Sequence, residues 1–334
     1  MSGWIFITGG AGYLGSHLAA QIKTMTDHSV MVIDRKGKDL PHATRYCDVF
    51  ADEDFTSKIV SMAIRDYRPK FVIHCADEPL RDRYLLDPIG AWKQNVSKTI
   101  ELLECCASSG VENFMFLSSG SIYRDGNSPI SEMSEIAPSN AYSRSKLAIE
   151  HLLKDCYIGH GIGSISFRTF GIAGCHNLYD LGHLPGSPYL IPRLIESALG
   201  RGTLEVMGRS QPTPDGTPVR DYLHVMDLCD AVVRSLSWLE ENPGAHCINL
   251  ASGTGTSVQQ IIDLSEDLLG RKIPYVYGDR SAVDPPSRIA DVSIVRDLLN
   301  WTPRRSISDM ILDSYKWASS PEFKRLLVNG VRHD

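Results

Sequence analysis

Short runs of apolar residues alternate with longer amphipathic segments through the first half of the chain. The apolar runs predict β-strands at residues 4–8, 30–34, 71–75, 114–118 and 165–170. A further short strand is expected to end at Asp48-Val49. The segments between the runs predict helices near residues 12–23, 55–67, 90–109 and 142–156. Strands that alternate with helices of this length indicate βαβ units and a parallel sheet covered on both faces.

The alternation becomes irregular after residue 170, where glycine and proline gather at residues 182–192 and 212–218. Loop-rich segments that follow a rigid sheet commonly carry substrate specificity. We therefore predict an α/β fold with a doubly wound parallel (Rossmann) sheet over residues 1–170. Residues 171–334 are expected to form a smaller, loop-rich α/β substrate lobe, with some of its chain returning to the first sheet.

Composition narrows the function classes. The chain has 334 residues, of which 43% are hydrophobic and 22% are charged, as in ordinary soluble proteins. Its formal net charge of −6 offers no basic surface for nucleic acid or anionic lipid. No apolar stretch approaches the roughly 20 residues of a membrane span. The eight cysteines are scattered without a C-x-x-C pair, so we expect free thiols, no metal site and a cytoplasmic protein.

A glycine-rich segment follows the first predicted strand and opens the first predicted helix. It reads TGGAGYLG, with Gly9, Gly10, Gly12 and Gly15 in the spacing of dinucleotide-binding loops. Glycine permits the tight turn, the approach of backbone to a pyrophosphate, and close packing of helix on strand. The helix N-terminus then supplies N–H groups and partial positive charge to phosphates. A plain glycine turn is the weaker alternative, because the predicted strand before the glycines and the predicted helix after them both fit a dinucleotide-binding loop.

Asp34, at the end of the second predicted strand, specifies which dinucleotide. A carboxylate there accepts hydrogen bonds from the adenosine ribose and repels a 2′-phosphate, which favours NAD over NADP. Arg35, Lys36 and Lys38 follow it, and basic residues can instead hold that phosphate. A solvated charged loop is the alternative for the two lysines. Asp48 is expected either to contact adenine or to cap a helix.

Candidate chemistry lies at the start of the fourth predicted helix. Tyr142 and Lys146 are four residues apart, so their side chains share one helix face. A nearby ammonium, with a positive nicotinamide ring, lowers the pKa of a tyrosine and lets it act as a base. Ser119 ends the strand before, where its hydroxyl can bridge a substrate and Tyr142. Taken alone, such a Tyr/Lys pair could instead be two solvent-exposed side chains on a helix with no role in catalysis.

These segments together resemble the extended short-chain dehydrogenases/reductases, and most closely the UDP-glucose 4-epimerases and related NAD-dependent nucleotide-sugar epimerases. The resemblance runs nearly end to end. The segments that carry it are TGGAGYLGSHL, FLSSGSIY, AYSRSKLAIE, PTPDGTPVRDYLHVMDL and INLASGTGTSV. It implies that residues 1–170 bind NAD and that residues 171–334 bind a nucleotide sugar.

The resemblance also implies the site residues. The catalytic trio is Ser119, Tyr142 and Lys146. The implied cofactor-binding residues are Gly9, Gly12, Tyr13, Leu14, Gly15, Asp34, Asp48, Val49, Cys75, Ala76, Asn95, Tyr142, Lys146 and Phe170. The implied substrate-binding residues are Ser119, Ser121, Tyr142, Gly171, Tyr189, Arg220, Asp284 and Arg288. Among these, Arg220 is expected on the diphosphate and Asp284 on the nucleotide ribose.

Several positions depart from the family on the sugar side. Pro79 replaces a lysine, Gly171 replaces an asparagine that contacts UDP, and Tyr189 replaces another asparagine. Arg288 occupies the position that gates the sugar pocket. Its guanidinium suits a carboxylate, as in a uronic acid, or a phosphate oxygen. Alternatively, it turns outward or pairs with a local acid such as Asp284 or Asp291.

The predicted function is an NAD-dependent nucleotide-sugar 4-epimerase that oxidises the sugar transiently at C4 and returns the hydride to the opposite face. Gly120-Ser121 stands where related dehydratases carry an Asp-Glu pair, which argues against elimination of water. The alternatives are another redox reaction or a decarboxylation on a nucleotide sugar, and a non-catalytic NAD-binding regulatory protein. The resemblance further implies a homodimer.

Overall fold

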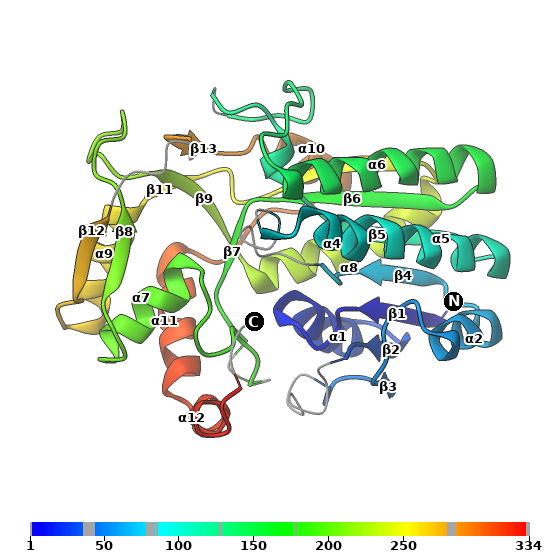
Figure 1. Cartoon of the computed structure of the whole chain (residues 1–334), viewed down its shortest axis with the longest axis horizontal. Helices are drawn as coiled ribbons and strands as arrows, with labels where there is room; N and C mark the ends of the chain where they lie inside the picture. Colours follow the sequence, from blue (N-terminus) through cyan, green and yellow to red (C-terminus); the bar gives the residue numbers. More distant parts are fainter. Residues whose placement is uncertain are drawn as a thin grey trace.

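The structure of the chain is a computed structural model, shown in Figure 1. It describes residues 2–35, 44–77, 84, 86–126, 129–176, 178, 180–278 and 285–331. Four positions discussed above, Lys36, Lys38, Pro79 and Asp284, lie outside the described residues.

A seven-stranded sheet organises the right-hand part of Figure 1. All of its neighbouring strands are parallel, in the order β10-β6-β5-β4-β1-β2-β3. The strands are β1 (Trp4–Thr8), β2 (Ser29–Ile33), β3 (Val49–Ala51), β4 (Phe71–His74), β5 (Asn113–Ser119), β6 (Gly163–Thr169) and β10 (Ala245–Leu250). The predicted doubly wound α/β fold is confirmed, and β10 comes from the second half of the chain.

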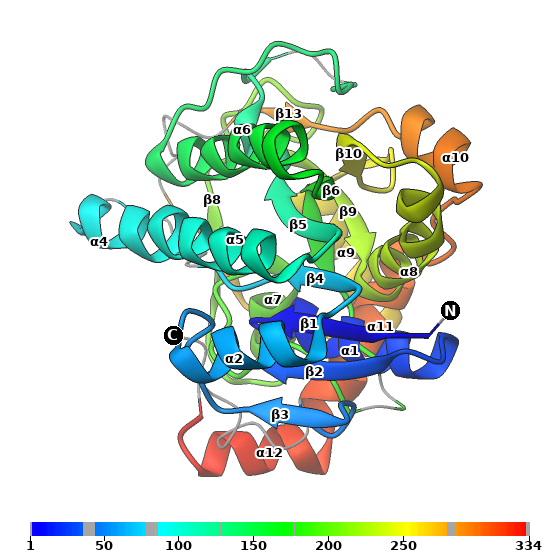
Figure 2. The same ribbon diagram turned by 90° about the vertical axis from the view of Figure 1, so that its right-hand side faces the viewer.

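Helices cover both faces of this sheet, as Figure 2 shows. One face packs against α1 (Tyr13–Met25), α8 (Val225–Glu241) and α10 (Ser293–Leu299). The other packs against α2 (Lys58–Tyr67), α5 (Lys98–Ser109) and α6 (Ala141–His160). Alternate residues of each strand enter opposite layers: Ile5 and Ile7 lie in one core and Phe6 in the other. Burial on both faces explains why these strands read as continuous apolar runs.

The remaining elements form the left-hand part of Figure 1. Its strands are β7 (Gly171–Ala173), β8 (Leu204–Met207), β9 (Val219–His224), β11 (Gly255–Ser257), β12 (Tyr275–Gly278) and β13 (Ser287–Arg288). Its helices are α7 (Leu190–Ala198), α9 (Val258–Leu269), α11 (Ile307–Ser319) and α12 (Pro321–Val328). A third hydrophobic cluster joins these helices, with Leu194, Ile261 and Trp317 among its buried residues.

One predicted helix is interrupted. The segment expected as a single helix over residues 90–109 is divided into α4 (Pro88–Trp92), a π-helical turn (Lys93–Ser97) and α5. Such π turns often occur at functional sites. This one carries Asn95, whose side chain is 3% exposed.

Candidate functional site

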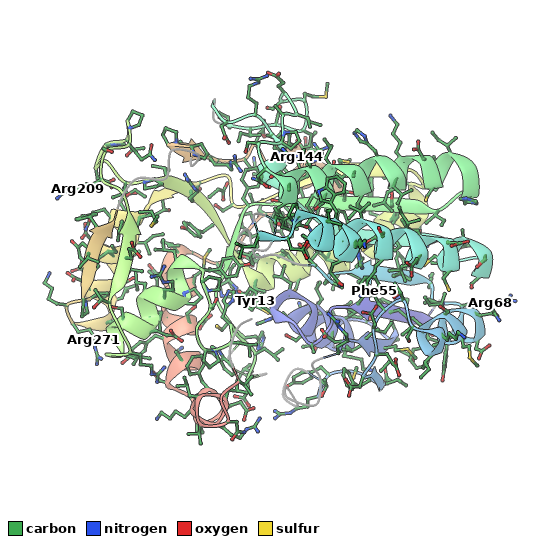
Figure 3. All side chains as sticks on the ribbon, in the orientation of Figure 1. Tyr13, Phe55, Arg68, Arg144, Arg209 and Arg271 are labelled. Carbon is green, nitrogen blue, oxygen red and sulfur yellow. The ribbon has the colours of Figure 1, made fainter. Side chains whose placement is uncertain are left out.

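The order of the sheet locates the site. Strand order reverses between β1 and β4, and ligands of doubly wound folds bind at the carboxyl ends of the strands on either side of such a switch point. The glycine-rich loop leaves β1 there, and Cys75 and Ala76 leave β4 beside it. Figure 3 places Tyr13, the first residue of α1, between the sheet and the second half of the molecule.

Close backbone packing shapes the glycine-rich loop. Gly9 has φ +65°, and a Cβ on it would lie 2.6 Å from the backbone nitrogen of Ala76. A Cβ on Gly15 would overlap the carbonyl oxygen of Gly9. Larger residues are therefore excluded at both positions, and Gly12 caps α1 without any side chain to accept from its first amides. That leaves the helix N-terminus suited to an anion such as a pyrophosphate.

Asp34 supports the loop from the adjacent strand. Directly after β2, it accepts a hydrogen bond on Oδ2 from the backbone N–H of Ala11, 3.1 Å away. The neighbouring Arg35 lies 3.8 Å from Asp54 in an exposed ion pair. Its charge is thus directed at a carboxylate of the protein. The arrangement fits NAD, because the residue nearest the ribose position is acidic and the basic one has a partner.

Tyr13 and Leu14 begin α1 on the side facing the second half of the chain. The Tyr13 hydroxyl donates to the carbonyl of Gly174 at 2.7 Å, and its ring stacks on His183 at 3.6 Å between centroids. Leu14 packs against the core on the α1 face of the sheet. Tyr13 therefore joins the cofactor loop to the second half of the chain.

The prediction that Asp48-Val49 ends the third strand is wrong, because Val49 begins β3. Asp48 accepts from the backbone N–H of Val30 at 2.7 Å and pairs with Lys23 at 2.9 Å. Both residues lie at the amino edge of a parallel sheet, away from the carboxyl edge where the loop lies. The residue that follows β3 at the carboxyl edge is Asp52. A three-residue strand gives too little apolar pattern to fix its register from sequence.

The three predicted catalytic residues lie on β5 and α6, which pack together. Ser119 ends β5, and its hydroxyl donates to Ser121 at 2.9 Å. Ser121 in turn accepts from Ser143 of α6 at 2.8 Å. Lys146, which is 3% exposed, donates from Nζ to the carbonyl of Leu117 at 2.8 Å. The serine strand and the Tyr/Lys helix are thus joined by direct hydrogen bonds.

Tyr142 differs from expectation in its electrostatics. Its pKa is raised well above the ordinary value for tyrosine, first by burial of the phenol and then by the negative charge of Asp77. The Lys146 ammonium, which was expected to act on Tyr142 together with a nicotinamide ring, pairs with Asp77 at 2.6 Å in this structure. Sequence analysis missed Asp77, although its place three residues after β4 puts it at the carboxyl edge.

A cavity of about 210 Å³ opens beside these residues. Its lining residues are Ser119, Gly120, Ser121, Thr169, Phe170, Gly171, Arg220, Asp221 and Arg288. Five of the predicted substrate-binding residues and Phe170 are therefore brought together. Tyr189, the N-cap of α7, lies near Tyr142 and adds to the rise in its pKa.

Two arginines stand side by side in this cavity. Strands β9 and β13 run parallel with Arg220 opposite Arg288, so both side chains project from the same face. Arg288 forms an ion pair with Asp125. Arg288 lines the cavity, and its gating of a sugar pocket stays a prediction. The partners considered from the sequence, Asp284 and Asp291, did not include Asp125.

Asp221, also in the lining, has a supporting role. Its carboxylate accepts from the backbone N–H groups of Ser252, Gly253 and Ala290 at 2.8 to 3.2 Å. It thereby ties β9 to the segments before β11 and after β13. Within the described ranges no group of three or more His, Cys, Asp or Glu residues is placed to hold a metal ion.

Comparison with known proteins assigns the family. Residues 5–251 match the model of the NAD dependent epimerase/dehydratase family, and the chain belongs to this family. It is 31% identical to the UDP-glucose 4-epimerase of Azospirillum brasilense over 325 residues, covering 95% of this chain and 92% of that protein. The predicted NAD-dependent epimerase of the extended short-chain dehydrogenase/reductase type is thereby confirmed.

Solved structures agree. UDP-glucose 4-epimerase from Brucella ovis in complex with NAD superimposes with a TM-score of 0.88 at 31% identity, covering 96% of this chain and 98% of that one. The Bifidobacterium longum enzyme in complex with NAD+ and UDP gives 0.89 at 27% identity, with 96% and 99% covered. NAD as the cofactor is confirmed. No helix in the described part of the chain is long and apolar enough to cross a membrane.

Proposed function

We propose that this chain interconverts nucleotide sugars at C4, with a UDP-hexose as its substrate. The observation that carries this proposal is that predicted catalytic and predicted substrate-binding residues line one cavity. Ser119 of the catalytic trio lines the same cavity as Arg220 and Arg288. A hydroxyl of the catalytic trio and two adjacent guanidinium groups match a sugar hydroxyl linked to a diphosphate.

Each side of the cavity has a proposed task. Tyr142 exchanges a proton with the sugar 4-hydroxyl, Ser119 positions that hydroxyl, and Lys146 holds the nicotinamide ribose. Gly9, Gly12, Gly15 and Asp34 hold the NAD, which when bound accepts hydride from the sugar carbon and returns it. Because the keto-sugar can turn about its phosphate linkage, the hydride returns to the other face.

The nucleotide-sugar contacts are assigned by position. Arg220 binds the diphosphate, and Ser121 and Gly171 border the sugar in the cavity. Tyr189, which is 43% exposed, closes the site from the start of α7. We also propose that residues 1–170 form the cofactor domain and residues 171–334 the substrate lobe, with β10 shared.

A product screen tests the function. The purified protein is incubated with UDP-, GDP-, dTDP- and CDP-hexoses, and the products are analysed by NMR while absorbance at 340 nm reports NADH. We expect C4 epimers from UDP-hexoses without NADH accumulation. Stoichiometric NADH would instead identify a dehydrogenase. No turnover of any nucleotide sugar, with NAD bound, would identify a non-catalytic binding protein.

An acidic sugar is the second candidate substrate, and Arg288 is the observation that favours it. The ion pair with Asp125 balances the Arg288 charge in this structure. A uronic acid carboxylate would have to take the place of Asp125 on the guanidinium. In that exchange Arg288 keeps one carboxylate partner, whereas a neutral hexose leaves the Arg288–Asp125 pair intact.

We further propose a homodimer in a reducing, cytoplasmic setting. Large apolar side chains project from α4, α5 and α6, with Ile89, Ile100 and Ile158 respectively 70%, 47% and 74% exposed. An isologous pairing of this face would bury them. All eight cysteines are free thiols, which suits a reducing compartment. Light scattering that gives the mass of one chain at micromolar concentration would contradict the dimer.

A further inference from the structure

One carboxylate contacts both members of the catalytic pair. Oδ2 of Asp77 lies 2.6 Å from Nζ of Lys146 and accepts a hydrogen bond from the Tyr142 hydroxyl at 3.3 Å. The same oxygen thus stands between the ammonium and the phenol. The side chain of Asp77 is 15% exposed, so little water screens these contacts.

The carboxylate is held from its other side as well. Oδ1 accepts a hydrogen bond from Nδ2 of Asn95 at 2.5 Å. Asn95 is carried by the π-helical turn, and its amide also donates to the hydroxyl of Tyr84. Tyr84 meets Ser145 of α6 at 3.0 Å. Asp77 is therefore fixed between the π turn and α6.

Three described titratable side chains that lie near this pair, those of His74, Cys75 and Tyr189, are uncharged near neutral pH. Burial lowers the pKa of His74 to about 3 and raises the pKa of Cys75 and of Tyr189 to about 12. The positive charge of Lys146 adds to the lowering of the His74 pKa and opposes the rise in the Cys75 pKa. Tyr84 faces Tyr142 ring edge to face, with 5.7 Å between centroids.

Asp77 cancels the charge that Lys146 presents to the phenol. With the carboxylate and the ammonium in contact, the net charge beside Tyr142 is close to zero. The raised pKa of Tyr142 follows from burial first and from Asp77 second, with smaller contributions from Tyr189 and Tyr84.

We propose that Asp77 is a positioning residue of the catalytic centre: it holds Lys146 as its counter-ion and thereby sets the pH above which Tyr142 can accept a proton from the substrate. The proposal rests on the assignment of Tyr142 as the proton-transfer group. Removing only the charge of Asp77 should leave an unbalanced ammonium beside the phenol. Tyr142 should then lose its proton about one to three pH units lower.

A tyrosinate titration measures this directly and needs no substrate. Ultraviolet absorbance near 295 nm is followed against pH for the NAD-loaded protein and for the same protein carrying Tyr142→Phe, and the difference reports Tyr142. Asp77→Asn should titrate at least one pH unit below wild type. An unchanged midpoint, or one shifted upward, would overturn the proposal.

Three further variants separate charge from packing. Asp77→Glu keeps the charge and should titrate within about half a unit of wild type, whereas an equal downward shift in Glu and Asn would refute a charge effect. Asp77→Ser, also uncharged, should reproduce the Asn shift and serves if the Asn variant does not fold. The matched control is Glu240→Gln, which removes a carboxylate that is ion-paired with Lys70 at the amino end of β4 and should leave the Tyr142 midpoint unchanged.

Turnover gives a second readout. If a nucleotide sugar is converted, the acid limb of the kcat profile of Asp77→Asn should move to lower pH with KM nearly constant. A profile that does not move, in a folded variant, would contradict the proposal. If no nucleotide sugar is converted at all, the proposed function fails while the titration still decides the role of Asp77.

Discussion

The cofactor side and the sugar side of the site are built differently. On the cofactor side the surface is backbone: a loop folded so closely that Gly9 and Gly15 admit no side chain, supported by Asp34 on the next strand. On the sugar side the surface is made of side chains: Arg220 and Arg288 project from two neighbouring strands, and Arg288 pairs with Asp125 of a third segment. The first side fixes one ligand shape, whereas the second changes with single substitutions.

The first prediction removes the group at the meeting point of the two sides. Tyr142→Phe loses only the phenolic oxygen, so NAD binding and the free energy of unfolding should stay close to wild type. Turnover should fall at least about 100-fold, the usual contribution of a positioned acid–base group. Steady-state kinetics with NAD quantified in the purified protein test this. Near-wild-type turnover would disprove the assignment.

The second prediction breaks the cofactor side by adding one methyl group. Gly15→Ala places its Cβ against the Gly9 carbonyl, where backbone would have to move. We expect a loss of bound NAD and about 2 to 4 kcal/mol of stability, as for overpacking at a rigid site. The matched control is Gly159→Ala at an exposed position near the end of α6, where a Cβ meets nothing within 4 Å. It should be neutral or slightly stabilising. Equal effects of the two changes would contradict the account.

A third prediction concerns acid. Burial lowers the pKa of His17, beneath the cofactor loop, and of His74 to about 3, below the ordinary 6.5. Between pH 3 and 6.5 the unfolded chain therefore binds more protons than the folded chain. The stability that the two neutral histidines contribute is complete above pH 6.5 and is lost as the pH falls from 6.5 toward 3. Each histidine contributes about 1.4 kcal/mol per pH unit in that window. Denaturant unfolding at pH 7 and pH 5 measures it, and His74→Gln should flatten the slope. Equal stability at both pH values would refute it.

The difference between the two sides also explains what sequence could predict. The glycine loop, Asp34 and the Tyr142/Lys146 pair are local patterns, in which spacing along a strand or helix fixes the geometry. Asp77 pairs with Lys146, 69 residues away, and Asp125 pairs with Arg288, 163 residues away. Only the tertiary fold brings such distant residues together, so no local pattern predicts these contacts. The register of β3 was misjudged because three residues carry no clear period.

The fourth prediction adjusts the cofactor side without breaking it. Asp34→Asn removes the charge that repels a 2′-phosphate, so the preference for NAD over NADP should narrow by about 10-fold, or 1.4 kcal/mol. Calorimetry with both cofactors measures the ratio. Glu240→Gln is the control and should leave the ratio unchanged, because Glu240 pairs with Lys70 at the amino end of β4. A wild-type protein that prefers NADP would overturn the role of Asp34.

The last prediction, of similar size, tests the sugar side and the proposed role of the Arg288–Asp125 ion pair in substrate choice. Arg288 pairs with Asp125 and also lines the cavity in which the sugar is proposed to bind. If the sugar bears a carboxylate, Arg288→Leu should lower kcat/KM for UDP-glucuronate about 10-fold relative to UDP-glucose, the value of one charge-assisted hydrogen bond.

Asp125→Asn should act in the opposite direction on the same ratio. It removes the carboxylate that competes for the guanidinium, and so should favour UDP-glucuronate, while UDP-glucose changes little. Opposite shifts in the two variants would assign Arg288 to an acidic sugar. If UDP-glucose is much the better substrate for wild type and for Arg288→Leu alike, the acidic-sugar candidate is wrong, and the Arg288–Asp125 pair then serves to shape a pocket for a neutral hexose.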